Sequence, residues 1–183
     1  MIRITESLLL YHDRLELRDT ASLDLVVLHC TELPTLAMAR EFGERIQYPE
    51  PGTGTSGHYY IDRDGSVWRY VQDDRMANHV VGFNRTSLGI ELVNTGRYPC
   101  WFHAGHQAMT EPYAGSQIKS LRELLIRLRE RYPGLIKLAR HSDLDTQTMP
   151  AEDDPSTQVR RRIDPGPLFP WEDIRAFWES LPH

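Results

Sequence analysis

Residues 23–30 (LDLVVLHC) constrain the fold of this chain more than any other stretch. Their apolar residues are almost continuous and rich in branched side chains, which is typical of a strand covered on both faces in an α/β sheet. Residues 87–93 (SLGIELV) have the same character, and residues 135–140 form a shorter strand. The strands alternate with helical stretches at residues 34–47, 116–132 and 171–181. This order predicts an α/β fold, with a mixed central sheet flanked by helices on both sides.

Three other stretches carry clear local signals. Residues 58–71 (HYYIDRDGSVWRYV) contain two strand-like runs around an Asp-Gly pair, which predicts a β-hairpin. The helix at 116–132 has an apolar stripe at helical spacing, and Ser116 is its expected N-cap. Residues 94–115 and 143–162 are expected to be long loops, the first of them rich in aromatic residues.

The length of 183 residues allows one domain whose core needs no disulfide or structural metal to fold. We expect a single domain over residues 1–183, with its core at about 24–181 and an N-terminal extension at 1–22. The formal net charge of -5 argues against nucleic-acid binding, which needs clustered Lys and Arg. The one basic run, residues 160–162 (RRR), is expected to be a solvated face.

Cys30 and Cys100 are too few for a disulfide framework and lack the spacing of a thiolate zinc site. No run approaches the ~18 apolar residues of a membrane span. The first residues lack the apolar region and the cleavage site of a secretory signal. We therefore expect a cytoplasmic protein, or a periplasmic or exported one if the sequence is truncated or is exported without such a signal.

Among the eight histidines, His29 and His141 are the best candidates for chemistry, because each lies at the end of an apolar strand. Strand ends at the edge of a sheet are where α/β proteins assemble their sites. Asp164 lies in the stiff segment RIDPGP. A catalytic zinc takes three protein ligands, often two histidines and a carboxylate. The spacing of these three residues matches no short zinc motif, so a metal site and a turn-capping Asp164 both remain open.

Glu91 falls within a run that otherwise predicts a buried strand. Buried carboxylates are rare unless they are paired, linked to a metal or functional. Strand alternation places Glu91 on the face opposite Ile90 and Leu92, where it could face a cleft beside a metal. There it could take a proton from water and pass it to a leaving amine. A structural salt bridge to an arginine is the alternative.

Six short motifs occur in order along the chain. They are LHC at His29, SGHYYIDRDGSVWRYV, NHVVG around His79, SLGIEL ending near Glu91, HSDLD at His141 and DPGPLFPW at Asp164. Together they resemble the zinc-dependent N-acetylmuramoyl-L-alanine amidase family, whose members include AmpD- and AmiD-like enzymes, phage T7 lysozyme and the peptidoglycan recognition proteins. The resemblance runs from about residue 24 to residue 171 and leans toward the AmiD-like branch.

The resemblance implies the fold of these proteins and one Zn²⁺ per chain, held by His29, His141 and Asp164. It also implies that Glu91 is the general acid and base. The implied reaction hydrolyses the amide between the lactyl group of N-acetylmuramic acid, or its anhydro form, and L-Ala of peptidoglycan or muropeptides. That substrate is the expected partner, and the protein is expected to be a monomer.

The chain differs from T7-like members at one position and from the usual family pattern at another. Where T7-like members have a tyrosine it has Gly57, so a phenol-assisted reaction is excluded and the proton transfer falls to Glu91. Where the family usually has an oxyanion-stabilising lysine it has Arg162, which keeps the charge but not the shape. Arg160 or Arg161 could serve instead.

His79 stands at the family's motif histidine and is the expected substrate-binding residue, with a local hydrogen-bonding role as the alternative. The stretch between the second and third ligands is longer than usual and could form a lid or a specificity wall. The first rival function is a non-catalytic peptidoglycan-binding module of the same fold. The second is a thiol hydrolase using Cys30, although strand alternation points Cys30 away from His29.

Overall fold

The structure, a computed structural model, describes residues 2–182 and is built on a six-stranded sheet. Its strands lie in the order β1 (Ile4–Glu6), β4 (Val67–Arg69), β3 (Tyr59–Ile61), β5 (Ser87–Leu92), β2 (Leu25–Cys30) and β6 (Lys137–Arg140). Only the β3–β4 pair is antiparallel, and the other neighbours run parallel. The predicted mixed sheet is therefore confirmed.

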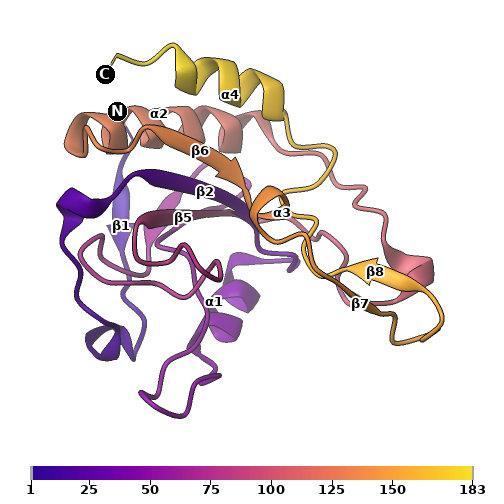
Figure 1. Ribbon diagram of the computed structural model, residues 1–183. Helices are drawn as coiled ribbons and strands as arrows, with labels where there is room; N and C mark the ends of the chain where they lie inside the picture. Colours follow the sequence, from indigo (N-terminus) through magenta and orange to yellow (C-terminus); the bar gives the residue numbers. More distant parts are fainter. Residues whose placement is uncertain (1, 183) are drawn as a thin grey trace.

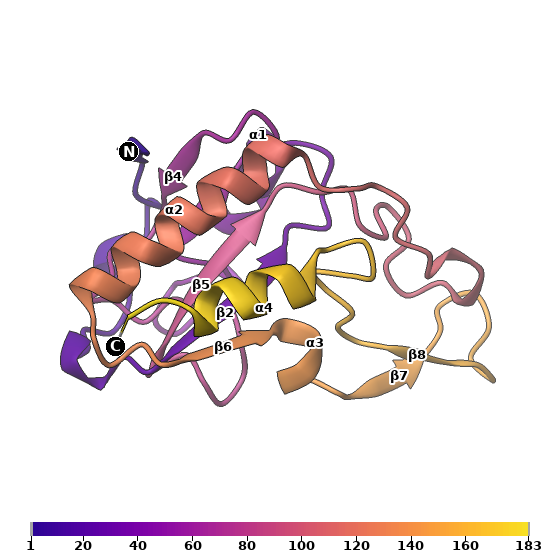
Figure 2. The same ribbon diagram turned by 90° about the horizontal axis from the view of Figure 1, so that it is seen from above.

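Helices cover both faces of this sheet. The structure has α1 (Leu36–Glu44), α2 (Gly115–Arg131), the short α3 (His141–Leu144) and α4 (Trp171–Glu179), with 3-10 turns at His12–Arg14, Thr20–Ser22 and Ala104–His106. Helices α2 and α4 lie side by side on one face, and α1 lies on the other (Figures 1 and 2). Within residues 2–182, no helix is both long and apolar enough to cross a bilayer.

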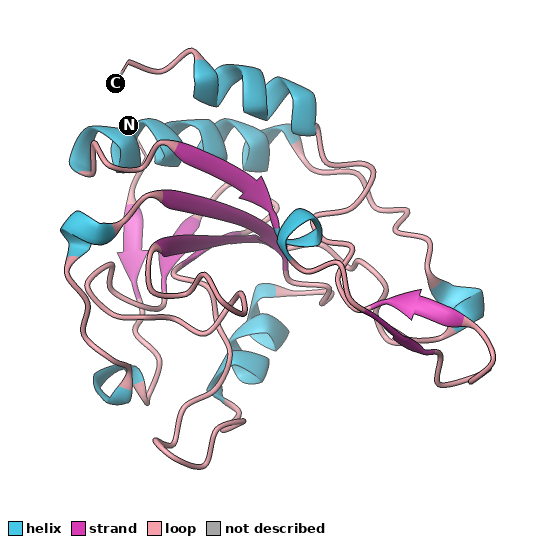
Figure 3. Ribbon diagram, viewed as in Figure 1, coloured by secondary structure: helices cyan, strands magenta, loops and turns pink. Residues whose placement is uncertain are grey.

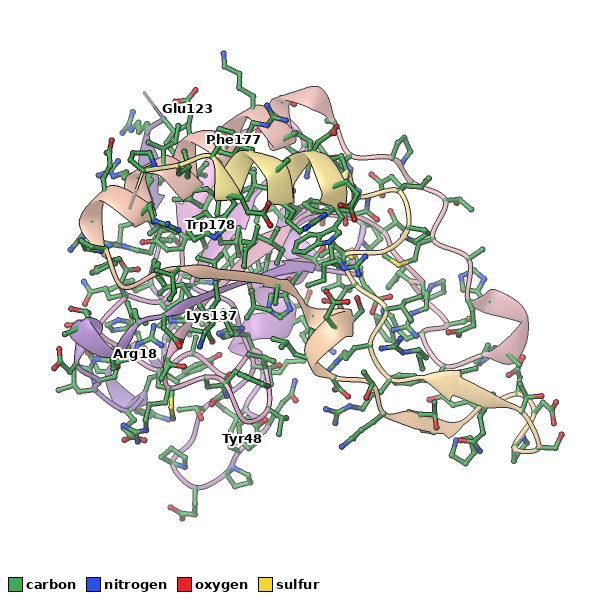
Figure 4. All side chains as sticks on the ribbon, turned by 45° about the horizontal axis from the view of Figure 1, so that its top comes forward. Arg18, Tyr48, Glu123, Lys137, Phe177 and Trp178 are labelled. Atoms are coloured by element: carbon green, nitrogen blue, oxygen red, sulfur yellow. The ribbon has the colours of Figure 1, made fainter. Side chains whose placement is uncertain are left out.

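The hydrophobic core follows from the alternation of side chains along the central strands. Val26 and Leu28 of β2 join the main cluster beneath α2 and α4, together with leucines of α2. Leu25 and Val27 point to the opposite face, where they pack with Val80. Trp178 of α4 closes the main cluster, and its indole Nε1 donates a hydrogen bond to Ile136 O at 3.2 Å (Figure 4). Both faces of β2 are thus buried, as its continuous apolar run predicts.

Two local predictions have different outcomes. The hairpin is confirmed: β3 and β4 pair around a turn in which Gly65 has φ +86°, a conformation that favours glycine. The cap of α2 is wrong, because Ser116 lies inside the helix and its hydroxyl donates to Arg63 O. Gln117 performs the capping instead, with its Oε1 accepting a hydrogen bond from Ala114 N at 3.1 Å.

The N-terminal residues pack against the rest of the fold. Strand β1 pairs in parallel with β4 at the edge of the sheet. Leu9, Tyr11 and Leu15 are buried in a second cluster that also contains Tyr60 of β3. The predicted domain boundaries stay a prediction, but the segment expected to be an extension contributes a strand and core residues.

A two-stranded ribbon replaces part of the loop predicted at residues 143–162. Strands β7 (Thr148–Pro150) and β8 (Gln158–Arg160) pair antiparallel and project from the body of the protein (Figure 3). Glu152 N donates to Phe102 O at 2.9 Å, and Asp153 accepts a hydrogen bond from Ala104 N at 2.6 Å. The ribbon therefore rests on the aromatic segment at 94–115, a contact between distant segments that no local pattern signals.

A buried ion pair fixes the base of this ribbon. The Arg97 side chain is fully buried and donates to both carboxylate oxygens of Glu32, from Nε at 2.7 Å and from Nη2 at 2.9 Å. The same guanidinium donates to Arg160 O at 3.0 Å and Arg161 O at 3.2 Å. Arg97 thus links the end of β2 to the segment that leads to Arg162.

Arg97→Ala is expected to lower the free energy of unfolding by about 3–5 kcal/mol, because it leaves the Glu32 carboxylate buried without its partner. Urea unfolding measures this change. Arg45→Ala is the control, since Arg45 forms an exposed pair with Glu41 one helical turn away and should cost less than about 1 kcal/mol. Equal losses in the two variants would contradict a stabilising role for the buried pair.

Candidate metal and catalytic site

The candidate site lies at the carboxyl ends of three parallel strands. His29 is the penultimate residue of β2, and Glu91 is the penultimate residue of β5. The two are register partners, so their side chains leave the sheet on the same face. His141 directly follows β6 as the first residue of α3. The parallel pairing of these strands therefore brings together residues that are far apart in the sequence.

His29, His141 and Asp164 converge through one atom each. His29 Nδ1 lies 3.0 Å from His141 Nδ1 and 3.2 Å from Asp164 Oδ2, and His141 Nδ1 lies 3.1 Å from the same oxygen. All three side chains are buried, with residue exposures of 2%, 5% and 3%. Within residues 2–182 they form the one group of His, Cys, Asp and Glu with the geometry to hold a metal.

Neighbouring contacts hold Asp164 in place. Its backbone oxygen accepts a hydrogen bond from Ser142 N at 3.0 Å, next to His141. The hydroxyl of Tyr113 donates to Pro165 O at 2.7 Å. Burial disfavours the carboxylate, but the adjacent His141, through its charge and its hydrogen bond, holds the pKa of Asp164 well below its usual range. Asp164 is thus kept as an anion inside the protein.

The distances between these three side chains match the coordination of a zinc ion better than a set of hydrogen bonds among them. A tetrahedral zinc with ligand bonds of ~2.0–2.2 Å separates its ligand atoms by roughly 3.3 Å, close to the three distances observed. Protons alone cannot lie favourably on all three edges of such a triangle. The second carboxylate oxygen, Asp164 Oδ1, is also buried without a hydrogen-bond partner in the described part of the chain. Two imidazoles and one carboxylate are ligands that zinc prefers.

Glu91 lies beside this triangle and faces the cavity. Its neighbours Ile90 and Leu92 point into the main core, as the strand alternation predicts. Burial raises the pKa of Glu91 to about 8, with the Asp164 carboxylate adding to the rise and Arg162 opposing it. A carboxyl group whose pKa lies near the working pH can both accept and return a proton.

The Glu91 shift predicts a pH dependence of stability in the metal-free protein. The folded pKa of about 8 exceeds the ordinary value of 4.5, so the folded state binds the extra proton between those values. The contribution of Glu91 is full below about pH 4.5 and is lost as the pH rises through about 8. His29 acts in the opposite sense, because burial and then His141 lower its pKa to about 4.

Comparison with Glu91→Gln isolates the Glu91 contribution. The difference in unfolding free energy, wild type minus variant, should fall as the pH rises from about 4.5 to about 8. Urea unfolding in the presence of a chelator at several pH values measures it. A difference that stays flat across this range would contradict the raised pKa.

Gly57 occupies the position at which the phenol-assisted reaction would need a tyrosine. A Cβ atom at Gly57 would lie 2.8 Å from Glu91 Cγ and 3.2 Å from Gly89 O. A tyrosine at Gly57 is therefore incompatible with Glu91 in its present position. The hydroxyl of Tyr60 in β3 accepts a hydrogen bond from Gly57 N at 3.2 Å. The proton-transfer role of Glu91 stays a prediction.

The basic run at 160–162 is not the solvated face that its composition predicts. Arg160 is exposed, but Arg161 forms an ion pair with Asp145, and Arg162 lines the cavity with its Nε buried. Tertiary contacts fix the backbone of this run, because Arg97 donates to the carbonyl oxygens of Arg160 and Arg161. Arg161 and Arg162 both line the cavity, and Arg162 is the arginine of the run whose charge acts on the pKa of Glu91.

His79 contacts His29 at the ring nitrogen that does not meet His141 and Asp164. Its Nδ1 lies 3.0 Å from His29 Nε2, and its Nε2 lies 3.1 Å from Ser87 Oγ. Burial, then the neighbouring His29 and His58, hold the pKa of His79 well below its ordinary value. The ring also lines the cavity, so the predicted contact with substrate stays a prediction.

A cavity of about 440 Å³ opens in front of these groups. Its wall includes Arg161, the alternative to Arg162 named from the sequence, and residues that were not singled out there, namely Glu32, Tyr48, Tyr60, Trp101 and Phe102. The aromatic content of residues 94–115 was a signal for Trp101 and Phe102, whereas nothing local marked Glu32. Cys30 is buried, and burial raises the pKa of its thiol well above the ordinary value, with Asp164 adding to the rise. That environment does not favour the thiolate that a thiol hydrolase needs.

Comparison with known proteins decides the family. Residues 19–167 match the model of the family described as N-acetylmuramoyl-L-alanine amidase. The chain belongs to this family. The resemblance expected from the six motifs is thus confirmed.

Similar proteins from a phage and from a bacterium agree with this assignment. The chain is 33% identical to the endolysin of Klebsiella phage KP32 over 99 residues, which are 52% of this chain and 58% of that protein. It is 29% identical over 119 residues to the amidase AmiD of Escherichia coli strain K12, covering 59% of this chain and 36% of AmiD. The chain thus spans a little over half of the phage relative and about a third of AmiD.

Solved structures share the fold of this amidase-family chain. The endolysin amidase LysCS from Clostridium intestinale superposes with a TM-score of 0.68 at 23% identity, over 96% of this chain and 95% of that one. A structure of E. coli AmiD with the substrate anhydro-N-acetylmuramic acid-L-Ala-D-gamma-Glu-L-Lys superposes with a TM-score of 0.64 at 23% identity, over 85% and 57% of the two chains. These likenesses confirm the predicted amidase fold.

Proposed function

We propose that the protein is a zinc-dependent N-acetylmuramoyl-L-alanine amidase. It hydrolyses the amide between the lactyl group of N-acetylmuramic acid, or its anhydro form, and L-Ala. The observation that carries the proposal is the triangle of His29, His141 and Asp164 with a protonatable Glu91 beside it. Family membership and the substrate seen with AmiD support the choice of bond.

His29 Nδ1, His141 Nδ1 and Asp164 Oδ2 would hold one Zn²⁺. Zinc in such a site supplies a Lewis acid that polarises a carbonyl group and makes water acidic enough to lose a proton near neutral pH. Glu91 accepts the proton of the water as the water oxygen bonds to the amide carbon. Glu91 then returns that proton to the amide nitrogen as the carbon–nitrogen bond breaks. The products are the lactyl carboxylic acid and the free amine of L-Ala.

Arg162 is the candidate for stabilising the oxyanion that forms on the carbonyl oxygen. Its guanidinium lines the cavity and lies close enough to Glu91 to lower the pKa of that carboxyl. A fixed positive charge directed at developing negative charge is the usual means of stabilising such a state. Trp101 and Phe102, which belong to the aromatic segment at 94–115, line the same cavity and would form a wall for the rest of the substrate.

A digestion experiment tests the proposal. Metal-depleted protein, with and without added Zn²⁺, is incubated with anhydro-muropeptide or whole sacculi, and the products are identified by mass spectrometry. We expect zinc-dependent release of stem peptides with a free L-Ala amine. Binding without release would indicate the non-catalytic binding module. Release that survives chelation but is lost in Cys30→Ala would indicate a thiol hydrolase. The two substrates compared side by side identify which form of muramic acid is preferred.

A further inference from the structure

Hydrogen bonds link four groups in a row, from the Phe83 carbonyl through Ser87 of β5 and His79 to His29 of the metal triangle. Ser87 Oγ lies 2.8 Å from the carbonyl oxygen of Phe83 and 3.1 Å from His79 Nε2. His79 Nδ1 lies 3.0 Å from His29 Nε2. The other nitrogen of His29, Nδ1, is the one that meets His141 and Asp164.

The Phe83 carbonyl, the first group in this row, sets the direction of each hydrogen bond in it. The Phe83 carbonyl carries no proton, so the single hydroxyl proton of Ser87 points at it. Ser87 Oγ must then accept from His79, which places the His79 proton on Nε2. A neutral imidazole with its proton on one nitrogen presents a lone pair at the other. His79 Nδ1 therefore accepts from His29 Nε2–H, and His29 Nδ1 is left with a lone pair.

The surrounding structure holds the His79 ring in this position. A Cβ atom at Gly89 would lie 2.7 Å from His79 Nδ1, so glycine at this strand position leaves the room that the ring occupies. The His79 backbone is held by Asn84, whose Oδ1 accepts from His79 N at 3.0 Å and from Val80 N at 2.8 Å. Both the ring and its backbone are thus fixed by residues of the β5 region.

We propose that His79, directed by Ser87, is a positioning residue that fixes the proton of His29 on Nε2 and so presents the Nδ1 lone pair to the metal. The inference rests on the proposed zinc site. Without such direction a free imidazole would divide itself between two tautomers, and the Nδ1–H form would have to lose that proton before binding a cation. Partners of this kind behind a ligating histidine typically account for about 10- to 100-fold of metal affinity.

Two variants of nearly equal shape test this role. His79→Asn keeps a carbonyl oxygen close to the place of the His79 Nδ1 acceptor, whereas His79→Leu has no acceptor there. We expect His79→Leu to bind Zn²⁺ about 10- to 100-fold more weakly in competition with a chelator, and His79→Asn to retain most of the affinity. Ser87→Ala, which frees the His79 ring to reverse its hydrogen bonds, should weaken binding in the same direction.

The ¹⁵N spectrum of the imidazoles in the metal-free protein gives a readout that a merely structural role would not change. We expect His29, assigned by its loss in His29→Gln, to carry its proton on Nε2 in the wild type and in His79→Asn. In His79→Leu it should become a mixture of tautomers. A wild-type His29 protonated on Nδ1, or equal zinc affinity in the Leu and Asn variants, would overturn the inference. Unchanged affinity in Ser87→Ala would remove Ser87 from it.

Failure of this inference can be separated from failure of the proposed function. If the wild type binds zinc and cleaves muropeptide while His29 is protonated on Nδ1, only the positioning role of His79 fails. If the wild type takes up no zinc, the proposed function fails. The tautomer of His29 in the metal-free protein still decides then whether the hydrogen-bond chain exists.

Discussion

Glu91→Gln is expected to lower amidase turnover by about 10²- to 10⁴-fold, the usual contribution of a general acid and base. Glutamine keeps the size of the side chain and can neither accept nor return a proton. The position of Glu91 beside the triangle but outside it means that zinc affinity should change little. Turnover on anhydro-muropeptide and zinc content measured on the same preparation test both statements.

Glu41→Gln provides the control for this experiment. Glu41 is exposed on α1 and pairs with Arg45 on the same helix, so its replacement should leave turnover unchanged. A Glu91→Gln protein that is fully loaded with zinc and fully active would contradict the proposed mechanism. A Glu91→Gln protein that loses its zinc would instead place Glu91 among the groups that hold the metal.

Asp164→Ala is expected to abolish both zinc binding and activity. The variant removes one of three ligand atoms and the only anion of the triangle. The loss of zinc affinity should exceed the about 10- to 100-fold that removal of a supporting residue typically costs. It should also lower the pKa of Glu91, because the Asp164 carboxylate contributes to its rise. Chelator competition measures the loss of zinc binding, and digestion of muropeptide measures the loss of activity.

Asp143→Ala is the matched control, since Asp143 lies in α3 close to the site but pairs with Arg140. It should keep both zinc and activity. Wild-type zinc affinity in Asp164→Ala would contradict the ligand assignment. In the wild type, a chelator should remove activity and added Zn²⁺ should restore it, so activity that survives chelation would contradict the metal requirement itself.

Much of the fold was predictable because its signals are local. A short apolar run rich in branched side chains, such as residues 23–30, is typical of a strand with both faces covered, and the apolar stripe of α2 indicates a helix packed on a core. The Asp-Gly pair before β4 signals its hairpin in the same way. The ribbon of β7 and β8 was missed because each strand has three residues and gains its order from contacts with residues 102–104.

The sequence likewise predicts one part of the candidate site, the identity of its residues, but not their convergence. His29, His141, Asp164 and Glu91 could be named from the sequence, because polar groups at the ends of apolar strands and ordered family motifs mark them. Their convergence could not be derived from spacing, since 112 residues separate His29 from His141. Only the parallel register of β2 with β5 and β6 makes these strand ends neighbours.

Three features were decided by the tertiary structure alone. Arg162 lines the cavity although the composition of residues 160–162 predicts a solvated run, and tertiary contacts of Arg97 with the carbonyl oxygens of Arg160 and Arg161 hold this segment. Gly57 is confined by Glu91 on the neighbouring strand. Ser87 and His79 are joined to His29 by hydrogen bonds across strands. Residue type and periodicity act over a few residues, whereas the direction of a hydrogen bond and the burial of a charge depend on partners that only the folded chain supplies.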